Sequence, residues 1–462
     1  MEMWLKKSLV FTVLIAVLAT TLFGCNGSTG GTPGNTASNT TSDTPAEPKV
    51  VKLAHGFTNG EGASAFMIAG YEWVMAVKEK YEKDNPGNEV KLEFITMADM
   101  NTKLMTDYNA GIKHDAFTSQ SSEILQHIAV GSIADMTPYF SKWSQEEQND
   151  FKWHPNWGAY EIDKKLYGLP LGLHTRTIAY RKDLFKQAGL DPEKTPKTLD
   201  ELVEYAQKLT TKDVWGLGLY LGPHAASTEV LMMPLIWSLN GSIFDDNTKM
   251  ATFNTPEAVQ AIQWMYDCVY KYKVTPSWTL SGLQNESLLK PFLAGQFAMA
   301  FGIGNYWLPD LQNADLISGA YPATANVDDS KVGWFICPEE NGVTYANSWG
   351  ISMASTVSDQ EETFKLITAA VDKEVIKKFI GFGGFPARKS GYDAPEYKSE
   401  FWQKWLDIAA TGREAPHTAN YNSLKDSLTT AMQEIITSQD DSKIKETLQR
   451  YQDEYNNRYG GK

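Results

Sequence analysis

The chain has 462 residues and a formal net charge of −14 at pH 7. A chain of this length is too long for a single hydrophobic core, so it predicts two lobes or domains. The acidic balance argues against binding to nucleic acid or to anionic lipid through surface charge, because like charges repel.

The first residues have the pattern of a bacterial signal peptide. Two lysines precede the apolar run 9–23, which is too short to span a membrane comfortably. The run leads to Cys25, in a context that resembles a lipobox, where the cysteine thiol receives a diacylglyceryl group and the peptide is cut just before it. We expect residues 1–24 to be a lipoprotein signal peptide and Cys25 to be the lipidated residue, with palmitate among its acyl chains. The alternatives are an ordinary secretory peptide and an uncleaved anchor.

The segment 25–48 consists largely of Gly, Ser, Thr, Asn and Pro, with almost nothing apolar. Such a composition cannot bury enough surface to fold, so we expect a flexible tether between the lipid and the folded part. A tethered, lipid-anchored protein suits a cell with no outer membrane. The sequence therefore favours the outer face of a Gram-positive cell membrane.

The common catalytic and metal-binding motifs are absent from the sequence. It contains no G-x-S-x-G, H-E-x-x-H, C-x-x-C, P-loop or G-x-G-x-x-G pattern, and its seven His residues are scattered. We therefore expect no metal, no cofactor and no enzyme activity. A pair of carboxylates far apart in sequence, as in a glycosidase, stays open. For Cys268 and Cys337, two buried free thiols are favoured over a disulfide, which stays possible.

The first part of the folded chain alternates strand patterns with helix patterns. This alternation predicts a mainly parallel sheet with covering helices. Ligands in such sheets bind at the loops beyond the carboxyl ends of strands, here 55–61 and 119–123. We expect strands at 50–54, 90–95 and 115–118, and helices at 65–81, 100–108 and 124–130.

The stretch 166–211 carries the clearest local signals. A β-rich run at 177–180 is followed by helix formers, and Gly189 stands where a left-handed helix stop belongs. Thr198 and Glu201 form the pattern of a capping box, in which each side chain satisfies an amide of the first helical turn. Five apolar residues behind this pattern fall on one helical face: Leu199, Leu202, Val203, Ala206 and Leu209.

The remaining chain continues the mixture of strands and helices. A helix start with proline in its first turn is expected at 254–257. The other expected elements are strands at 215–220 and 349–354, a helix followed by a strand within 288–304, and helices at 228–239, 361–372, 424–437 and 442–459.

Three consecutive runs within this chain closely resemble one protein family. They read YGLP, AYRKDLFKQAGLD and PKTLDEL, and together they span 167–202. Their order is similar to that of the extracellular solute-binding proteins of family 1, the maltose-binding-type receptors of ABC importers. The runs LLKPFLAGQFAMA and FGGFPAR resemble further motifs of this family. The resemblance covers roughly residues 50–459.

The resemblance implies an α/β, two-lobed periplasmic-binding-protein-like fold (type II). Each lobe would have a mainly parallel sheet with covering helices, with a hinge between the lobes. We place the N-terminal lobe at 49–172 and 335–370, and the C-terminal lobe at 173–334 and 371–462.

The resemblance also implies a function. The protein would be a lipid-anchored, monomeric receptor that captures a carbohydrate, an oligosaccharide above all, in the cleft between its lobes. It would close about a hinge and deliver the ligand to an ABC permease. The alternatives are the same receptor for a polyamine, a phosphorylated compound or an organic acid, a surface glycosidase, and a sensor or adhesin that binds sugar without transport.

Aromatic side chains are the first candidates for the ligand site, because sugars stack their C–H faces on indole and phenol rings. Trp307 follows a strand and matches the place where family members often keep a sugar-stacking tryptophan. Trp349 opens a strand at the presumed cleft, while Trp237 and Trp278 lie in the second lobe and Tyr421 precedes a helix. Packing in the core or hinge is the alternative for each.

Polar candidates follow from the matching family positions. His174 and Arg176 lie just past the first crossover and offer donors and acceptors to hydroxyl groups; a hinge hydrogen bond or interlobe ion pair is the alternative. Helix capping is the alternative for the group after the third strand, and a surface salt bridge for Arg388. The other candidates are Phe57, Asn59, Glu61, Ser119, Gln120, Glu123 and Arg388.

Overall fold

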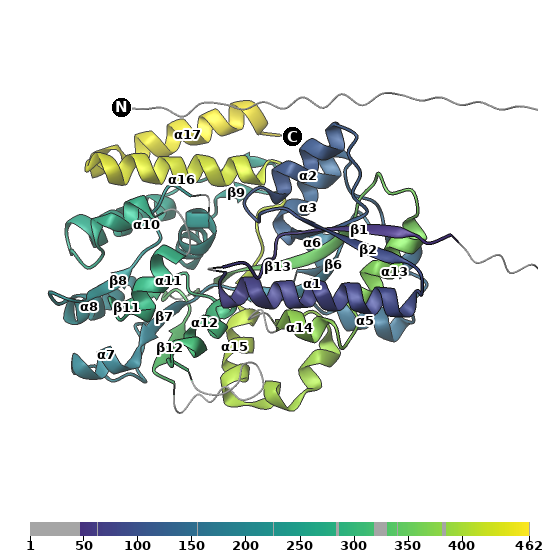
Figure 1. The fold of residues 1–462 in the computed structure, drawn as a ribbon. Coiled ribbons are helices and arrows are strands. Elements are labelled where there is room, and N and C mark those ends of the chain that lie inside the picture. The colour runs from purple at the N-terminus through teal and green to yellow at the C-terminus, as the bar shows by residue number, and fades with distance from the viewer. Residues whose placement is uncertain are drawn as a thin grey trace, which may run out of the picture. The chain divides into compact units, whose positions relative to one another are not determined.

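A computed structural model describes residues 47–61, 63–154, 156–224, 226–282, 286–317, 330–339, 341–380 and 385–461. The expected signal peptide, Cys25, nearly all of the tether and the first three residues of the FGGFPAR loop lie outside the described residues. Residues Pro48–Lys462 form one compact unit (Figure 1). Within the described ranges, no helix is both long and apolar enough to cross a membrane.

The larger sheet of this unit is mixed rather than mainly parallel. Its strand order is β14-β6-β13-β3-β1-β2, with β15 paired to β13. β1 pairs in parallel with β2 and β3, whereas β13 runs antiparallel to β3 and β6. The expectation of a mainly parallel sheet was wrong here, because long β13 brings the chain back to this sheet in the opposite direction. The strands are β1 (Val50–His55), β2 (Glu89–Phe94), β3 (Ala116–Gln120), β6 (Leu169–Thr175), β13 (Thr344–Met353), β14 (Phe385–Pro386) and β15 (Gly412–Arg413).

Helix α1 (Ala65–Asp84) covers this sheet through one buried face. Trp73, Val77 and Tyr81 recur at helical spacing and are fully buried. The Trp73 indole donates a hydrogen bond to the carbonyl of Ala370, at 3.0 Å, and so ties α1 to the end of α13. The other helices of this part are α2 (Met100–Asn109), η1 (Ser121–Glu123), α3 (Ile124–Val130), α4 (Thr137–Phe140), α5 (Gln145–Lys152), α6 (Trp157–Tyr160), α13 (Gln360–Ala370) and α14 (Ile376–Ile380).

The second sheet has the order β12-β7-β11-β8 and is also mixed. β11 pairs in parallel with β8 but antiparallel to β7. Its strands are β7 (Ile178–Arg181), β8 (Trp215–Gly218), β11 (Phe297–Phe301) and β12 (Val332–Phe335). The helices around it include α7 (Lys182–Gln187), α8 (Leu199–Leu209), α9 (Met233–Ser238), α10 (Pro256–Tyr270), α11 (Glu286–Leu293), α12 (Leu308–Asn313), α15 (Glu400–Ala410), α16 (Tyr421–Ser438) and α17 (Ile444–Tyr459).

Short elements complete the described chain. Two strand pairs lie outside both sheets: β4 (Glu161–Ile162) with β5 (Lys165–Leu166), and β9 (Phe244–Asp245) with β10 (Met250–Ala251). The short helical turns are η2 (Thr228–Met232), η3 (Ser277–Ser281), η4 (Asn305–Trp307), η5 (Lys389–Asp393), η6 (Pro395–Lys398) and η7 (Asp441–Lys443).

Local signals in the sequence located several of these elements. Gly189 has a φ of +73°, as a left-handed helix stop requires. The Thr198 hydroxyl accepts from the amide of Glu201 at 3.2 Å. The second half of the capping box differs, because the Glu201 carboxylate accepts from the amide of Lys197 instead of that of Thr198. The expected helix 228–239 begins as a π-helical turn, η2.

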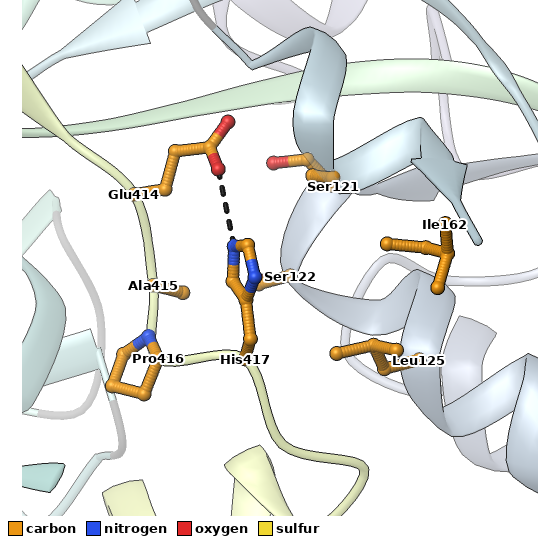
Figure 2. A pocket seen from close by; sticks show the side chains of 9 residues that line it. Ser121, Ser122, Leu125, Ile162, Glu414, Ala415, Pro416 and His417 are labelled. Carbon is orange, nitrogen blue, oxygen red and sulfur yellow. Dashed lines mark hydrogen bonds and ion pairs between the residues drawn. The ribbon is translucent and has the colours of Figure 1, made fainter. Parts of the chain in front are cut away.

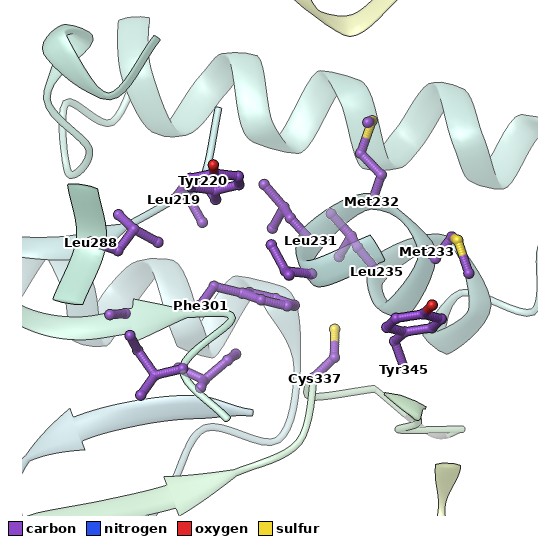
Figure 3. Close-up of a cluster of buried hydrophobic side chains, with 14 of the residues drawn as sticks. Leu219, Tyr220, Leu231, Met232, Met233, Leu235, Leu288, Phe301, Cys337 and Tyr345 are labelled. Carbon is purple, nitrogen blue, oxygen red and sulfur yellow. The ribbon is translucent and has the colours of Figure 1, made fainter. Parts of the chain in front are cut away.

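Each sheet packs against its own hydrophobic core, and we call the parts around these cores the first and second lobes. The second core includes Leu231, Met232, Leu235, Phe301 and Cys337 (Figure 3). Cys337 and Cys268 are both buried free thiols, which settles the open question of a disulfide. Burial raises the pKa of the Cys337 thiol to about 12 and keeps it protonated.

The chain changes from one core to the other inside two strands. In β6, Leu171 packs in the first core and Leu173 in the second; in β13, Ala346 packs in the second core and Trp349 in the first. Segment 335–346 therefore packs with the second lobe, and 371–379 with the first. A division by packing falls later in the chain than the expected limits at 335 and 371. β13 carries second-lobe residues at its start, and Phe379 of α14 packs on Trp73 of α1 in the first core.

Arg388 forms a buried ion pair within the first lobe. Its Nη1 lies 3.1 Å from Oδ2 of Asp150, and its Nε donates to the carbonyl of Val371 at 2.7 Å. Both side chains of the pair are at most 10% exposed. Burial alone would raise the pKa of Asp150, but hydrogen bonds from Ser390 and Arg388 outweigh it and hold that pKa below its ordinary value. The guanidinium of Arg388 thus has protein partners, in a buried rather than a surface salt bridge.

Replacing Arg388 by Met should lower the free energy of unfolding by about 3–5 kcal/mol, because Asp150 is left buried without its cation. The difference from the wild type should shrink below about pH 4, where Asp150 becomes protonated in the unfolded and then in the folded protein. Denaturant unfolding at pH 7 and pH 3 measures both effects.

The matched control is Arg450→Met, which removes an ion pair with Glu434 whose side chains are 44% and 47% exposed. A pair this exposed should contribute less than about 1 kcal/mol. Equal losses in the two variants would contradict the structural role assigned to Arg388.

Candidate functional site

The candidate site lies where β6 and β13 cross between the lobes. His174, near the end of β6, pairs in register with Asn347 of β13. The side chain of Asn305 accepts from the amide of Thr175 at 2.8 Å and donates to the carbonyl of Leu173 at 3.1 Å. Because Asn305 begins η4, these bonds hold His174 beside the short helix that carries Trp307.

Aromatic rings from both lobes meet at this crossing. Phe66, in the first turn of α1, has its ring centroid 5.8 Å from that of Tyr306 and 6.3 Å from that of Trp307. It also lies 6.1 Å from the ring of His174. Phe66 packs against both hydrophobic cores, so it links the lobes. The sequence analysis missed Phe66 and Tyr306, although the place of Tyr306 beside Trp307 could have suggested it.

His174 and Arg176 bring polar groups into this aromatic surrounding. Burial, with the positive charge of Arg176 adding to it, holds the pKa of His174 well below its ordinary value, so its ring is neutral. A neutral imidazole can both donate and accept. The Arg176 guanidinium stacks 4.5 Å from the centre of the Tyr306 ring and 5.9 Å from that of Tyr345.

A buried carboxylate, Glu229 of η2, forms the centre of a charged cluster beside Arg176. Its Oε1 lies 3.0 Å from the ammonium of Lys425 and 3.0 Å from the hydroxyl of Tyr421. The hydroxyl of Tyr345 donates to the same oxygen at 3.2 Å. Burial alone would raise the pKa of Glu229, but Lys425 and Arg176 outweigh it and lower that pKa, so the group is ionised.

Sequence reasoning placed Tyr421 among the candidates but missed Glu229 and Lys425. The only signal for Glu229 is a carboxylate that opens an otherwise apolar run, EVLMMPLIW. Lys425 gives no signal, because a lysine on an amphipathic helix is ordinarily solvated. Here its side chain is only 13% exposed.

The first lobe supplies the end of β3 and η1. The side-chain oxygen of Gln120 accepts from the amide group of Asn347 at 2.9 Å, and the backbone amide of Gln120 donates to the Glu123 carboxylate at 3.0 Å. Helix capping, the alternative for this group, therefore takes place through Gln120 and Glu123 instead of through Ser119 or Ser122. Burial raises the pKa of Glu123, and the nearby Glu229 adds to the shift.

Four buried polar atoms at the crossing have no hydrogen-bond partner in the described part of the chain. They include donors and acceptors, and they come from both lobes and from β13. A buried polar atom left unsatisfied is costly, so such atoms indicate a polar ligand or ordered water. They are Oγ of Ser119, Nε of Arg176, Nε1 of Trp307 and Oδ1 of Asn347.

Several other candidates from the sequence lie away from this group. Phe57 is fully buried and packs with Trp349, at 5.6 Å between ring centroids, in the first core. Asn59 and Glu61 lie exposed on the loop after β1. Packing alone accounts for the surroundings of Phe57, while the loop residues have open solvent around them.

The two second-lobe tryptophans also have neighbours of their own. Trp237 is buried beneath the guanidinium of Arg413, 4.6 Å from the ring centre, and near Tyr345. Trp278 is 43% exposed and packs on Phe297 at 5.4 Å. Trp278 is thus a surface residue outside the aromatic group around Trp307.

A small cavity lies between η1 of the first lobe and the segment 414–417 (Figure 2). His417 lies 3.3 Å from Glu414, and this contact raises the pKa of its imidazole. The cavity has a volume of about 20 Å³, which is room for about one water molecule and none for a sugar. Close by, the side chain of Asn422 in α16 donates to that of Gln126 in α3 at 3.2 Å. The lobes are therefore in direct contact along this side.

No group of His, Cys, Asp and Glu side chains within the described ranges could hold a metal ion. The charged groups at the crossing instead interact with one another: Glu229 pairs with Lys425, and Arg176 lowers the pKa of the same carboxylate. This leaves hydrogen bonding, ring stacking and charge as the chemistry that the site can offer a ligand.

Comparison of the sequence and the fold with known proteins identifies the family of this chain. The profile of the bacterial extracellular solute-binding proteins matches residues 57–377. A binding protein of Brucella abortus (strain 2308) is 24% identical over 373 residues, which cover 78% of this chain and 83% of that protein. The sn-glycerol-3-phosphate-binding periplasmic protein UgpB of Escherichia coli (strain K12) is 29% identical over 199 residues, or 39% of this chain and 43% of its own.

Solved structures share the two-lobed fold at low sequence identity. A solute-binding protein of Thermotoga lettingae bound to α-D-tagatose has a TM-score of 0.74 and 21% identity, over 88% of this chain and 99% of that one. An ABC substrate-binding protein of Listeria monocytogenes in complex with cycloalternan has a TM-score of 0.70 and 22% identity, over 89% and 99%. Because the family profile spans more than half of the sequence, this chain belongs to the bacterial extracellular solute-binding proteins.

Proposed function

We propose that the protein is a lipid-anchored extracellular receptor that captures a neutral carbohydrate between its lobes and delivers it to an ABC permease. The observation that carries this proposal is the set of buried, unpartnered donors and acceptors at the crossing of β6 and β13. Each sugar hydroxyl can donate and accept, so a sugar satisfies such a mixed set. The rings of Phe66, Tyr306 and Trp307 offer faces on which its C–H groups can stack.

The ligands bound in related structures support a carbohydrate. The relatives from Thermotoga lettingae and Listeria monocytogenes are bound to tagatose and cycloalternan, and a T. maritima relative is bound to maltose. These sugars differ in size and linkage, so they support the class of ligand. An oligosaccharide is the form we favour, because several rings and polar atoms are spread over both lobes.

The charges around the site favour a neutral ligand over a charged one. Lys425 is paired with Glu229, and Arg176 acts on the same carboxylate. A phosphorylated ligand, as in the name of UgpB, would need cations without such a partner, and a polyamine would need free carboxylates. The pairing therefore argues for hydroxyl groups as the polar part of the ligand.

A glycosidase is the rival that the geometry disfavours. Glu123 and Glu229 are carboxylates from opposite lobes, and a glycosidase uses two carboxylates that face each other across its cleft. Each one, however, already has a structural partner: Glu123 accepts from the amide of Gln120, and Glu229 is paired with Lys425. These partners fit a binding role, and product release during incubation with a glycan would favour the enzyme.

We propose that closure of the lobes couples ligand binding to delivery of the ligand to the permease. A ligand that contacts both lobes stabilises the closed state over the open one, in proportion to the contacts it makes only when closed. β6 and β13 join the lobes, so they act as the hinge. The closed protein, a monomer, then docks on the permease. Loss of sugar uptake on deletion of the gene separates this role from that of a sensor or adhesin.

Replacing Trp307 by Ala should weaken sugar binding by about 2 kcal/mol or more, roughly thirtyfold, because a stacking ring and an indole donor are both lost. Trp307→Phe should lose less, about 0.5–1.5 kcal/mol, since only the donor is removed. A thermal-shift screen of residues 26–462 against sugars, polyamines, amino acids and phosphosugars identifies the ligand. Ligand at about 100 times its Kd should add roughly 2.7 kcal/mol of stability.

The control for this series is Trp334→Phe. Trp334 is also buried with an unpartnered indole nitrogen in the described chain, but it packs against Phe401 and Trp405 in the second core. Its variant should bind sugar as the wild type does. Stabilisation by polyamines or phosphates alone would contradict the carbohydrate proposal.

Asn422→Ala should reduce sugar affinity by up to about tenfold, because it removes an interlobe hydrogen bond worth roughly 0.5–1.5 kcal/mol and so favours the open state. Asn341→Ala is the matched control, since Asn341 donates to Asn240 within the second lobe. Calorimetric titration gives the affinity, and small-angle scattering gives the open fraction without ligand. Unchanged affinity in Asn422→Ala would show that this contact does not contribute to closure.

Cys25→Ser should release the protein from the cell surface into the medium, because no thiol remains at position 25 to carry the lipid. In the wild type, metabolic labelling with a palmitate analogue should mark the protein in the membrane fraction. A Cys268→Ser variant, which alters a buried thiol of the second core, controls for loss of any cysteine. Labelling that persists in Cys25→Ser would contradict the lipoprotein assignment.

A further inference from the structure

Glu229 occupies an unusual stretch of backbone. It lies in the π-helical turn Thr228–Met232, directly before α9, and the residue is only 7% exposed. π-helical turns are rare and occur frequently at functional sites, because the extra residue redirects side chains. The turn places a carboxylate among three groups from two other segments: Tyr345 of β13, and Tyr421 and Lys425 of α16.

The hydrogen bonds of Glu229 are distributed unevenly between its two oxygens. Oε1 receives all three donors, from Tyr345, Tyr421 and Lys425. Oε2 receives none of the hydrogen bonds present in the described part of the chain. An ionised carboxylate taken out of water is costly unless its lone pairs are satisfied. One oxygen is thus held in place by the protein, and the other remains able to accept.

The charged and aromatic groups around Glu229 belong to the interlobe site. Arg176, which stacks on Tyr306, acts electrostatically on Glu229, and so does Glu123 from the first lobe. Tyr345 contributes to both groups, because its ring lies near Arg176 and its hydroxyl reaches Glu229.

We infer that Glu229 is a specificity-determining residue, whose Oε2 accepts a hydrogen bond from a ligand hydroxyl and whose charge excludes phosphorylated sugars. This inference rests on the proposed function, since it assigns a role within the same site. A hydroxyl carries the proton that a carboxylate oxygen requires. A phosphate group, largely deprotonated at pH 7, would place a second negative charge beside Glu229 with no hydrogen between them.

The same carboxylate also neutralises the charge of two cations, so that an anionic ligand is attracted to them less strongly. Lys425 lies 3.0 Å from Glu229, and the charge of Arg176 also lowers the pKa of this carboxylate. If Glu229 becomes a glutamine of nearly equal size, both cations are left buried without their anion. They should then attract a phosphate.

The test compares wild type, Glu229→Gln and Glu204→Gln in calorimetric titrations against four probes: tagatose, tagatose 6-phosphate, maltose and maltose 6′-phosphate. Glu204 is an exposed residue of α8, so its variant removes one charge outside the site. Wild type and Glu204→Gln should bind at least one neutral sugar and should bind its phosphate ester more weakly. Glu229→Gln should lose about tenfold to hundredfold in affinity for the neutral sugar and gain affinity for the ester.

The double variant Glu229→Gln with Lys425→Met provides a second test if the single variant does not fold properly. It removes Lys425 together with the carboxylate, so it should still lose affinity for the sugar. It should gain less affinity for the ester than Glu229→Gln does, because only Arg176 is left without its anion. Thermal unfolding without ligand establishes that each variant is folded. An equal gain for the ester in the double variant would contradict the role assigned to the Glu229–Lys425 pair.

Two failures remain distinguishable. If wild type binds a neutral sugar and Glu229→Gln binds it equally well, the role of Glu229 is wrong and the receptor function stands. A wild type that prefers the ester also overturns this inference. If wild type binds neither the four probes nor any sugar of the wider screen, the carbohydrate function fails, and the inference fails with it.

Discussion

The antiparallel pairing of β6 and β13 is the constraint on which the rest of the structure depends. Each strand has one end in the first hydrophobic core and the other in the second. Because the two strands are hydrogen-bonded to each other, neither lobe can move without bending this pair. The same pair of strands holds His174 opposite Asn347 and places both where β6 and β13 cross between the lobes. The proposed hinge and the candidate site therefore share these residues.

Two buried ion pairs show how similar chemistry can serve different purposes. Arg388 and Asp150 join segments of one lobe, and backbone groups or Ser390 take up their other hydrogen bonds. Glu229 and Lys425 lie beside the crossing between the lobes, and Oε2 of Glu229 can still accept a hydrogen bond. A buried pair with further protein partners supports the fold, whereas a pair with spare capacity can recognise a ligand. This difference decides which of the two charged pairs we connect with specificity.

The aromatic residues divide in a similar way. The chain contains 14 tryptophans, and most of those seen in the structure fill the two cores. Trp349 packs on Phe57 in the first core, and Trp334 packs on Trp405 in the second. Trp307 differs because its neighbours Phe66 and Tyr306 come from opposite lobes. A ring at the crossing between the lobes is therefore a candidate for sugar stacking, whereas the many rings inside the cores stabilise the fold.

The sequence by itself determined the local structure of this protein and its family. Helix faces such as Trp73, Val77 and Tyr81, the stop at Gly189 and the cap at Thr198 depend on neighbours a few residues away, so their patterns are readable. Family-specific runs also pointed to His174, Arg176 and Trp307, which the structure brings to one crossing.

Only the tertiary structure decided the direction of the strands, the course of the chain between the lobes and the charged part of the site. β13 runs antiparallel to β3 and β6 because of where the chain returns from, which no local pattern records. Glu229 and Lys425 are 196 residues apart, and Phe66 reaches Trp307 from the other lobe. Such contacts arise from packing between distant segments, and their free energy appears only when both cores have formed.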